Sequence, residues 1–149
     1  MSDRNSSMRL AQILGATGLI PLIVADIGAV HGYGLIAVSL GNIYAAIILS
    51  FLGAIHWGLA LDRTQNPDES GPLLLWSVIP ALWGFFALWW SPLLATLILM
   101  LGFIAQWLAD FRLQRRGISW PGWFFPLRSA LTVGILILLA ILAIEVYYH

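Results

Sequence analysis

The stretch LIAVSLGNIYAAIILSFLGAIHWGLAL, residues 35–61, decides the fold, because it contains no aspartate, glutamate, lysine or arginine. An α-helix rises about 1.5 Å per residue, so a helix of this length crosses a hydrocarbon core of about 30 Å. Within that core every backbone polar group must be satisfied by the protein, and an α-helix satisfies its own. The stretch therefore predicts a membrane-spanning helix.

Four further stretches have the same apolar character. With the first, they predict five spanning helices over residues 10–30, 35–61, 72–90, 93–109 and 129–148. Of the charged residues, only Asp26 and Glu145 fall inside these ranges. This segregation is typical of a chain divided between water and hydrocarbon. We therefore expect a single all-α domain over residues 1–149, an integral membrane bundle of five transmembrane helices.

The composition excludes several classes of protein. The chain is 60% hydrophobic and 9% charged, whereas soluble domains carry about 25% charged residues. Intrinsic disorder needs the opposite balance of charge and hydrophobicity. The absence of cysteine excludes a disulfide scaffold and a thiolate metal site, and the net charge of zero argues against a nucleic-acid partner.

The arginines predict the orientation in the membrane. All seven basic residues are arginines, and a count of five spans puts every one of them on the same side of the bilayer: Arg4, Arg9, Arg63, Arg112, Arg115, Arg116 and Arg128. Loops rich in lysine and arginine stay in the cytoplasm. The pattern predicts a cytoplasmic N-terminus and a C-terminus on the outer, periplasmic side.

The segment 111–126 mixes arginine with tryptophan and phenylalanine. This mixture suits the headgroup layer of a membrane, where guanidinium groups meet phosphate and aromatic rings lie at the boundary. We therefore expect a short interfacial segment before the last helix. Its predicted headgroup contacts are Arg112, Arg115, Arg116, Trp120 and Trp123.

Small residues recur every four positions in the second span, at Ala46, Ser50, Ala54 and Gly58. Such a pattern allows another helix to approach closely, because packing rather than the hydrophobic effect drives helix association in lipid. The stripe predicts a helix-packing face. The neighbouring helix belongs either to this molecule or to a second copy or another protein.

Polar residues inside the spans are the candidates for a site. The candidate pocket residues are expected near the cytoplasmic side or on the helical face that carries His56. They are His56, Trp57, Asn42, Ser77, Gln106, Arg128 and Thr132. One hypothesis is a polar pocket that holds the head of a lipid, a quinone or another amphiphile. The alternative is structural: His56 and Gln106 bond to each other or to backbone carbonyls and so hold helices together.

Asp26 and Glu145 form a second candidate group, an acidic pair near the outer side. Three interpretations remain open: solvated groups at the interface, a pairing of Asp26 with Asn42, or a metal site with His31 and His149. The spacing from Asp26 to His31 matches no chelating motif, so no metal is predicted.

Three segments together resemble a known family: Gly18-Leu-Ile-Pro21, Ile48-Leu-Ser-Phe-Leu-Gly-Ala-Ile-His-Trp-Gly58, and Trp120-Pro-Gly-Trp123 with the following Leu127-Arg-Ser-Ala-Leu-Thr132. The chain is similar to small bacterial inner-membrane proteins that are classed as a domain of unknown function, a group that includes mitochondrial transmembrane protein 69. The resemblance implies an inner-membrane location and supplies no activity. In this family the position of His56 is often arginine or histidine, which suits contact with an anion or a headgroup.

No phosphate-binding loop, zinc-protease motif or Ser-His-Asp arrangement occurs, so no catalytic residue and no cofactor are predicted. We expect a non-enzymatic accessory or assembly component of an inner-membrane complex, with membrane lipids and other membrane proteins, or a second copy, as partners. The competing hypothesis is a protein that binds or transports a lipid, a quinone or another amphiphile in the polar pocket.

Overall fold

The computed structural model describes residues 2–62, 67–118 and 120–148. Within these ranges the chain is all-helical, as the apolar stretches predict. The helices are α1 (Ser2–Thr17), α2 (Ile20–Gly28), the π-helical turn η1 (Ala29–Tyr33), α3 (Gly34–Asp62), α4 (Pro67–Ala87), α5 (Pro92–Arg115) and α6 (Phe124–Tyr148).

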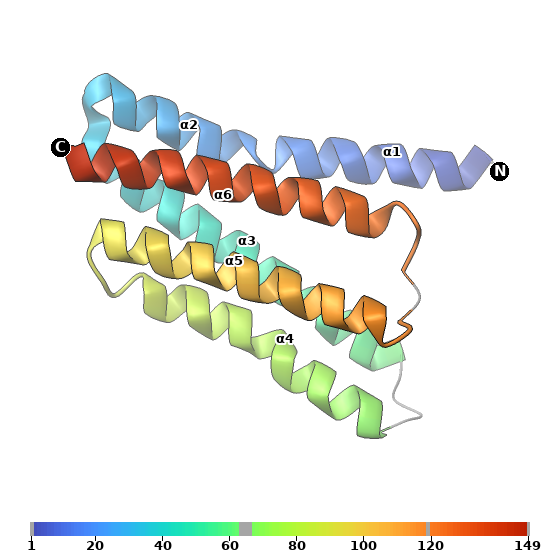
Figure 1. Ribbon diagram of the computed structural model, residues 1–149. Helices are drawn as coiled ribbons and strands as arrows, with labels where there is room; N and C mark the ends of the chain where they lie inside the picture. The colour runs from blue at the N-terminus through green and yellow to red at the C-terminus, as the bar shows by residue number, and fades with distance from the viewer. Residues whose placement is uncertain (1, 63–66, 119, 149) are drawn as a thin grey trace.

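The chain reverses direction at η1. Gly32 and Gly34 have φ angles of 95° and 35°, a region of backbone conformation that glycine enters without a steric penalty. His31 and Gly32 leave the helical conformation, and α3 then runs back along α2 (Figure 1). The turn predicted at residues 31–34 is therefore built on two glycines.

A smaller break separates α1 from α2. Pro21 stands in the first turn of α2, where its missing N–H leaves no helical hydrogen bond unmade. On the preceding side, the hydroxyl of Tyr44 in α3 donates to the carbonyl of Gly18 at 2.8 Å. The break is thus held against α3 by a side chain.

Helix α3 lies at the centre of the bundle and contacts α2, α4, α5 and α6. α1 and α2 run along one side of it next to α6, and the α4–α5 hairpin covers the other side (Figure 1). α1 begins at one end of the bundle, whereas α6 ends at the other. The core consists mainly of aliphatic side chains together with Phe103.

Four stretches are long and apolar enough to cross a membrane: Ser6–Asp62, Ser70–Ala87, Pro92–Arg115 and Phe124–Tyr147. Five separate spanning helices are not supported by this count. The reason is that the π-helical turn η1 links the predicted spans 10–30 and 35–61, so that the count takes Ser6–Asp62 as a single stretch although the chain reverses direction within it. The structure supports the coarser statement that the chain is a multi-pass, all-helical membrane protein.

Two helix ends differ from their predicted positions. α5 continues to Arg115, beyond the predicted end of its span at residue 109, and α6 begins at Phe124, before the predicted start at residue 129. Both ends of the predicted interfacial segment 111–126 therefore belong to these two helices. The shift brings Asp110 and Arg128 inside helices that face each other.

The closest helix contacts join α3 to α4. A Cβ atom on Gly53 would lie 2.6 Å from the carbonyl oxygen of Ser77, and one on Gly84 would lie 3.1 Å from the Cβ of Ala46. Close approach of this kind, based on small residues, maximises van der Waals packing between helices in lipid.

The predicted stripe of small residues does not form one packed face. Ala46 is buried against Gly84, whereas Ala54 and Gly58 are exposed. Ser50 lies between them and donates its hydroxyl to the carbonyl of Ala46. An α-helix has about 3.6 residues per turn, so each four-residue step rotates the position by about 40°. By Gly58 the stripe has turned away from α4.

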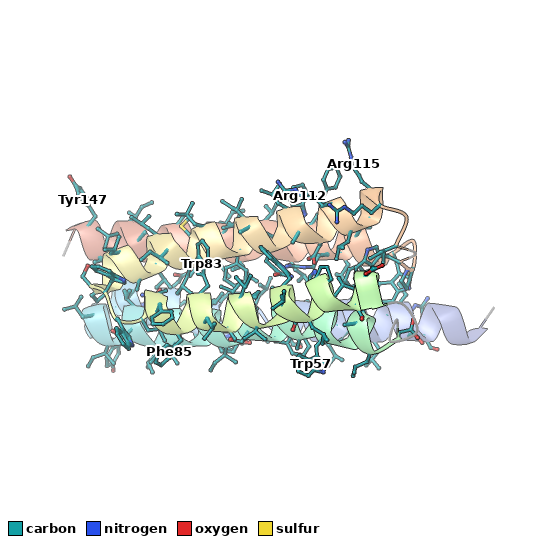
Figure 2. The ribbon with its side chains drawn as sticks, turned by 90° about the horizontal axis from the view of Figure 1, so that it is seen from below. Trp57, Trp83, Phe85, Arg112, Arg115 and Tyr147 are labelled. Carbon is teal, nitrogen blue, oxygen red and sulfur yellow. The ribbon has the colours of Figure 1, made fainter. Side chains whose placement is uncertain are left out.

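Apolar side chains cover the outside of the bundle (Figure 2). Large hydrophobic residues are exposed on every long helix, which is expected of a surface in contact with acyl chains. Arg112 and Arg115 lie near one end and Tyr147 at the opposite end, with the apolar surface between them (Figure 2).

Candidate functional site

A cluster of five polar side chains is buried near the end of the bundle where α3 and α5 finish and α6 begins. We call it the polar cluster; its members are His56 of α3, Gln106 and Asp110 of α5, and Arg128 and Thr132 of α6. The residues on α5 and on α6 are each four positions apart, so they lie on one face of their helix. Three helices thus supply one buried polar layer.

An ion pair forms the centre of the polar cluster. Arg128 Nε donates to Asp110 Oδ2 at 2.8 Å, and the two residues are only 4% and 2% exposed. Arg128 Nη1 donates to the hydroxyl of Thr132 at 2.7 Å, and that hydroxyl donates to the carbonyl of Arg128. The guanidinium is therefore fixed on two sides.

Gln106 connects this ion pair to His56. The indole N–H of Trp76 can only donate, and it donates to Gln106 Oε1 at 3.1 Å, which fixes the orientation of the amide. Gln106 Nε2 then donates to Asp110 Oδ1 at 3.2 Å and to the carbonyl of Leu52 at 3.4 Å, and it lies 3.3 Å from His56 Nδ1.

Both ring nitrogens of His56 face this network. Nδ1 lies 3.3 Å from Gln106 Nε2, and Nε2 lies 3.4 Å from Asp110 Oδ1. His56, Gln106 and Arg128 thus all contact one carboxylate, Asp110.

A cavity of about 400 Å³ adjoins the polar cluster, between α1, α3 and α6. We call it the Arg128 cavity. Among the described residues that line it, all are apolar side chains or glycines except for Arg128 and the indole of Trp123. Its size falls within the range of ligand-binding pockets, which are typically mostly apolar with a few polar groups.

One nitrogen of Arg128 has no acceptor. Nη2 is buried and makes no hydrogen bond to any described residue, although Nε and Nη1 both do. Leaving a charged donor unsatisfied in a buried position is unfavourable. The combination of an apolar cavity with an unused guanidinium nitrogen is what distinguishes this place as the candidate site.

The structure brings together four of the seven predicted pocket residues. His56, Gln106, Arg128 and Thr132 belong to the polar cluster, and the contact between His56 and Gln106 is the one that the structural alternative describes. Asp110 completes the cluster. Asp110 is not among the predicted pocket residues, because the predicted span 93–109 ends one residue before Asp110.

Asn42 does not belong to the polar cluster, contrary to the prediction. It precedes His56 by fourteen positions on α3, which is about 21 Å along a helix. Its amide donates to the carbonyl of Pro92 at 2.9 Å, and its oxygen accepts from Thr96 at 2.9 Å. Asn42 therefore joins α3 to the start of α5.

Two further predicted pocket residues also lie elsewhere. Ser77 is buried where α4 crosses α3 at Gly53, and its hydroxyl donates to the carbonyl of Leu74. Trp57 is 48% exposed on the outside of the bundle. Neither one contacts the polar cluster through a hydrogen bond between described residues.

The two predicted acidic residues lie near each other. The carboxyl groups of Asp26 on α2 and Glu145 on α6 repel each other when both are ionised, and Glu145 lines a second cavity of about 290 Å³. Asp26 is 7% exposed and is therefore not the solvated interface group of one interpretation. Pairing with Asn42 is also excluded, because the Asn42 side chain bonds to α5.

The metal interpretation gains no support in the described part of the chain, where no three metal-binding side chains come together. His149 lies outside the described residues, as does Arg63. His31 is exposed, and its Nδ1 contacts the carbonyl of Ile27 at 2.8 Å.

The predicted headgroup residues lie at the end of the bundle near the polar cluster. Arg112, Arg115 and Arg116 are exposed at the end of α5, where the Arg115 guanidinium lies 4.9 Å from the ring centre of Phe111. Trp120 stacks on Phe124, and Trp123 packs edge-on against the same ring. Trp123 also lines the Arg128 cavity.

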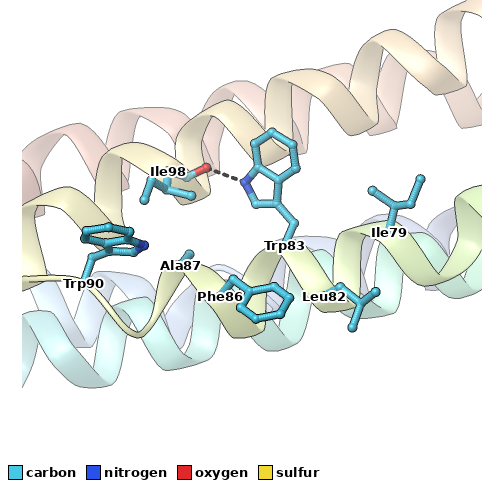
Figure 3. A pocket seen from close by; sticks show the side chains of 7 residues that line it. All are labelled: Ile79, Leu82, Trp83, Phe86, Ala87, Trp90 and Ile98. Atoms are coloured by element: carbon cyan, nitrogen blue, oxygen red, sulfur yellow. Dashed lines mark hydrogen bonds between the residues drawn. The ribbon is translucent and has the colours of Figure 1, made fainter.

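A third cavity, of about 320 Å³, lies on the α4–α5 hairpin (Figure 3). Trp83, Phe86 and Trp90 give it an aromatic wall. The indole N–H of Trp83 is already used, because it donates to the carbonyl of Ile98 at 2.8 Å. The indole N–H of Trp83 is therefore not free to bind a ligand in this cavity.

Comparison with known proteins shows to which family the chain belongs. No solved structure matches it. Transmembrane protein 69 of Xenopus tropicalis is 32% identical over 127 residues, which cover 83% of this chain and 49% of that protein. The chain thus spans about half the length of this curated relative. The family described as "Protein of unknown function (DUF3429)" matches residues 7–144, almost the whole chain. The chain belongs to the DUF3429 family, which is also the family that its sequence resembles.

Proposed function

We propose that this membrane protein binds an amphiphile in the Arg128 cavity. The observation that carries the proposal is the unsatisfied Nη2 of a 96% buried arginine beside an apolar cavity of about 400 Å³. An apolar chain would fill the space between α1, α3 and α6. Nη2 is enclosed by protein atoms, so the Arg128 side chain would turn toward the cavity, where a polar head would supply the hydrogen-bond acceptor that Nη2 lacks.

The surroundings of the cavity suit this role. Gly15 of α1 lines it, as does Gly18, which lies in the break between α1 and α2. α1 contacts the rest of the bundle mainly through α6, so the wall it forms is the least supported one. A helix with few packing partners is the part of a fold that separates most readily, and this provides a route of entry from the lipid.

Native mass spectrometry tests the proposal. Protein extracted in a mild detergent should carry a small amphiphile in a fixed ratio. The double variant Arg128→Leu/Asp110→Leu should lose it, because the donor is removed while no unpaired buried charge remains. Arg116→Leu, which removes an exposed arginine, is the matched control and should retain it. Equal ligand content in all three proteins would refute the proposed site.

A second candidate function is that of an accessory or assembly component of a membrane complex. The observation that favours it is the outward-facing half of the small-residue stripe: Ala54 and Gly58 are exposed, and a Cβ atom on Gly58 would meet no atom within 4 Å. A helix of another inner-membrane protein, or of a second copy, would fit closely there. Purification in mild detergent should then yield a partner in a fixed ratio that Gly58→Leu displaces; a lone monomer would count against this role.

For the topology we propose five crossings, with the N-terminus in the cytoplasm of a bacterial cell and the C-terminus in the periplasm. Support comes from the reversal at η1 and from the start of α1 and the end of α6 at opposite ends of the bundle. The exposed arginines after α5 lie at the end where α1 begins. Reporter domains fused to the two termini should respond on opposite sides of the inner membrane, and a response on the same side would exclude five crossings.

A further inference from the structure

The charges around the Arg128 cavity restrict the chemistry of its occupant. Among the described residues that line the cavity, Arg128 is the one that carries a charge, and Asp110 already neutralises it at 2.8 Å. His56 lies on the far side of Asp110, where its Nδ1 is 3.3 Å from Gln106 Nε2 and its Nε2 is 3.4 Å from Asp110 Oδ1. The polar cluster with a neutral His56 therefore has a net charge of zero.

An anionic head would disturb this balance. A carboxylate or phosphate at Arg128 Nη2 would share the guanidinium with Asp110, and two negative charges would then face one positive charge in an apolar interior. A buried charge without its own counterion is strongly unfavourable. The described residues offer no second cation there, because Arg112, Arg115 and Arg116 are exposed outside the cavity.

An uncharged acceptor would satisfy Arg128 Nη2 and would leave the net charge of the polar cluster unchanged. A carbonyl oxygen accepts the N–H groups of Nη2 through its lone pairs and adds no charge to the polar cluster. We infer that the occupant of the Arg128 cavity is an uncharged, carbonyl-headed amphiphile, with its carbonyl oxygen at Arg128 Nη2 and its apolar chain between α1, α3 and α6. This inference rests on the proposed function and specifies the ligand of the same site.

Two sources share this chemistry. One is the acyl ester of a bulk phospholipid, whose chain enters the cavity while its phosphate stays outside with the exposed arginines. The other is a free neutral lipid, such as a fatty ester or a quinone. The first source is present in every ester-linked bilayer, so vesicles of ether-linked lipid, which lack the carbonyl, separate the two.

A matched pair of brominated probes tests the inference. Bromine quenches tryptophan at short range, and Trp123 lines the cavity. Methyl dibromostearate and dibromostearate have the same brominated chain, and at about pH 9 the free acid carries a negative charge whereas its methyl ester carries none. Each probe is titrated into the full chain in ether-lipid vesicles. The part of the quenching that Trp123→Phe removes is the signal from the cavity.

The methyl ester is expected to quench Trp123 with at least about tenfold higher affinity than the carboxylate. This signal should disappear in Arg128→Leu/Asp110→Leu and persist in Arg116→Leu. Weaker quenching by the ester in ester-lipid vesicles than in ether-lipid vesicles would identify bulk phospholipid as the natural occupant. Equal quenching in both would identify a free neutral lipid.

The outcomes that would contradict the ligand inference differ from the one that would also contradict the proposed function. Equal or tighter binding of the carboxylate would overturn the inference and leave the cavity as a ligand site. Ester quenching that survives in the double variant would also overturn it, because the carbonyl would then not depend on Arg128. Absence of Trp123 quenching by both probes would overturn the proposed function and the inference with it.

Discussion

Replacing Arg128 by leucine is expected to lower the free energy of unfolding by about 3–5 kcal/mol, because Asp110 is left as a buried charge without its counterion. Asp110 would keep only the amide of Gln106 and the ring of His56 as polar neighbours among the described residues. The free energy of unfolding is to be measured by titration with a denaturing detergent in mixed micelles, for the wild type and the variant side by side.

The double variant Arg128→Leu/Asp110→Leu serves as the control. Replacing both partners of a buried ion pair by apolar residues is often neutral or stabilising, so most of the loss should be recovered. The exposed change Arg116→Leu should alter stability by less than about 0.5 kcal/mol. A double variant as unstable as Arg128→Leu alone would show that the ion pair is not the reason for the loss.

The second large effect is expected at the crossing of α3 and α4. Gly53→Ala should lower the free energy of unfolding by about 1–3 kcal/mol, because the added Cβ atom would lie 2.6 Å from the carbonyl oxygen of Ser77. The neighbouring atom belongs to the backbone of α4 and cannot move independently. The two helices must therefore separate, which weakens the closest contact in the bundle.

Gly58→Ala is the matched control on the same helix. A Cβ atom there meets no atom within 4 Å, and alanine favours a helix over glycine by up to about 1 kcal/mol. This variant should be as stable as the wild type or more stable in the same detergent titration. If both variants lost the same stability, the loss would come from the glycine positions in general and not from the crossing.

The sequence alone predicted the helices well because hydrocarbon imposes a simple rule. The charge-free stretch 35–61 corresponds closely to α3, and the turn at residues 31–34 corresponds to the reversal at two glycines. Hydropathy does not show whether two such stretches form separate helices or one continuous one. In the structure the first two predicted spans lie within the single apolar stretch Ser6–Asp62, which reverses direction at η1.

The candidate site was only half predictable. His56, Gln106 and Arg128 were grouped correctly, because an ionisable residue in a span needs a partner. Asp110 lies one residue beyond the predicted span 93–109, so it is not among the predicted pocket residues. The four-residue spacing from Gln106 to Asp110, together with the need of Arg128 for a counterion, is the signal that identifies it.

Asn42 was predicted to lie in the pocket with His56, but it lies elsewhere. Its seven-residue spacing series with His56 puts both on one face of α3, but a shared face does not mean a shared depth. Its partners, Thr96 and the carbonyl of Pro92, come from α5 near the other end of the bundle. Which polar groups meet across helices depends on helix pairing, which one sequence does not determine.

An experimental density map of the detergent-extracted protein tests the central claim most directly. We expect elongated density between α1 and α6 that ends within hydrogen-bond distance of Arg128 Nη2, about 2.7–3.2 Å. Collapse of α1 onto α6, with Nη2 bonded to a protein group, would contradict the claim.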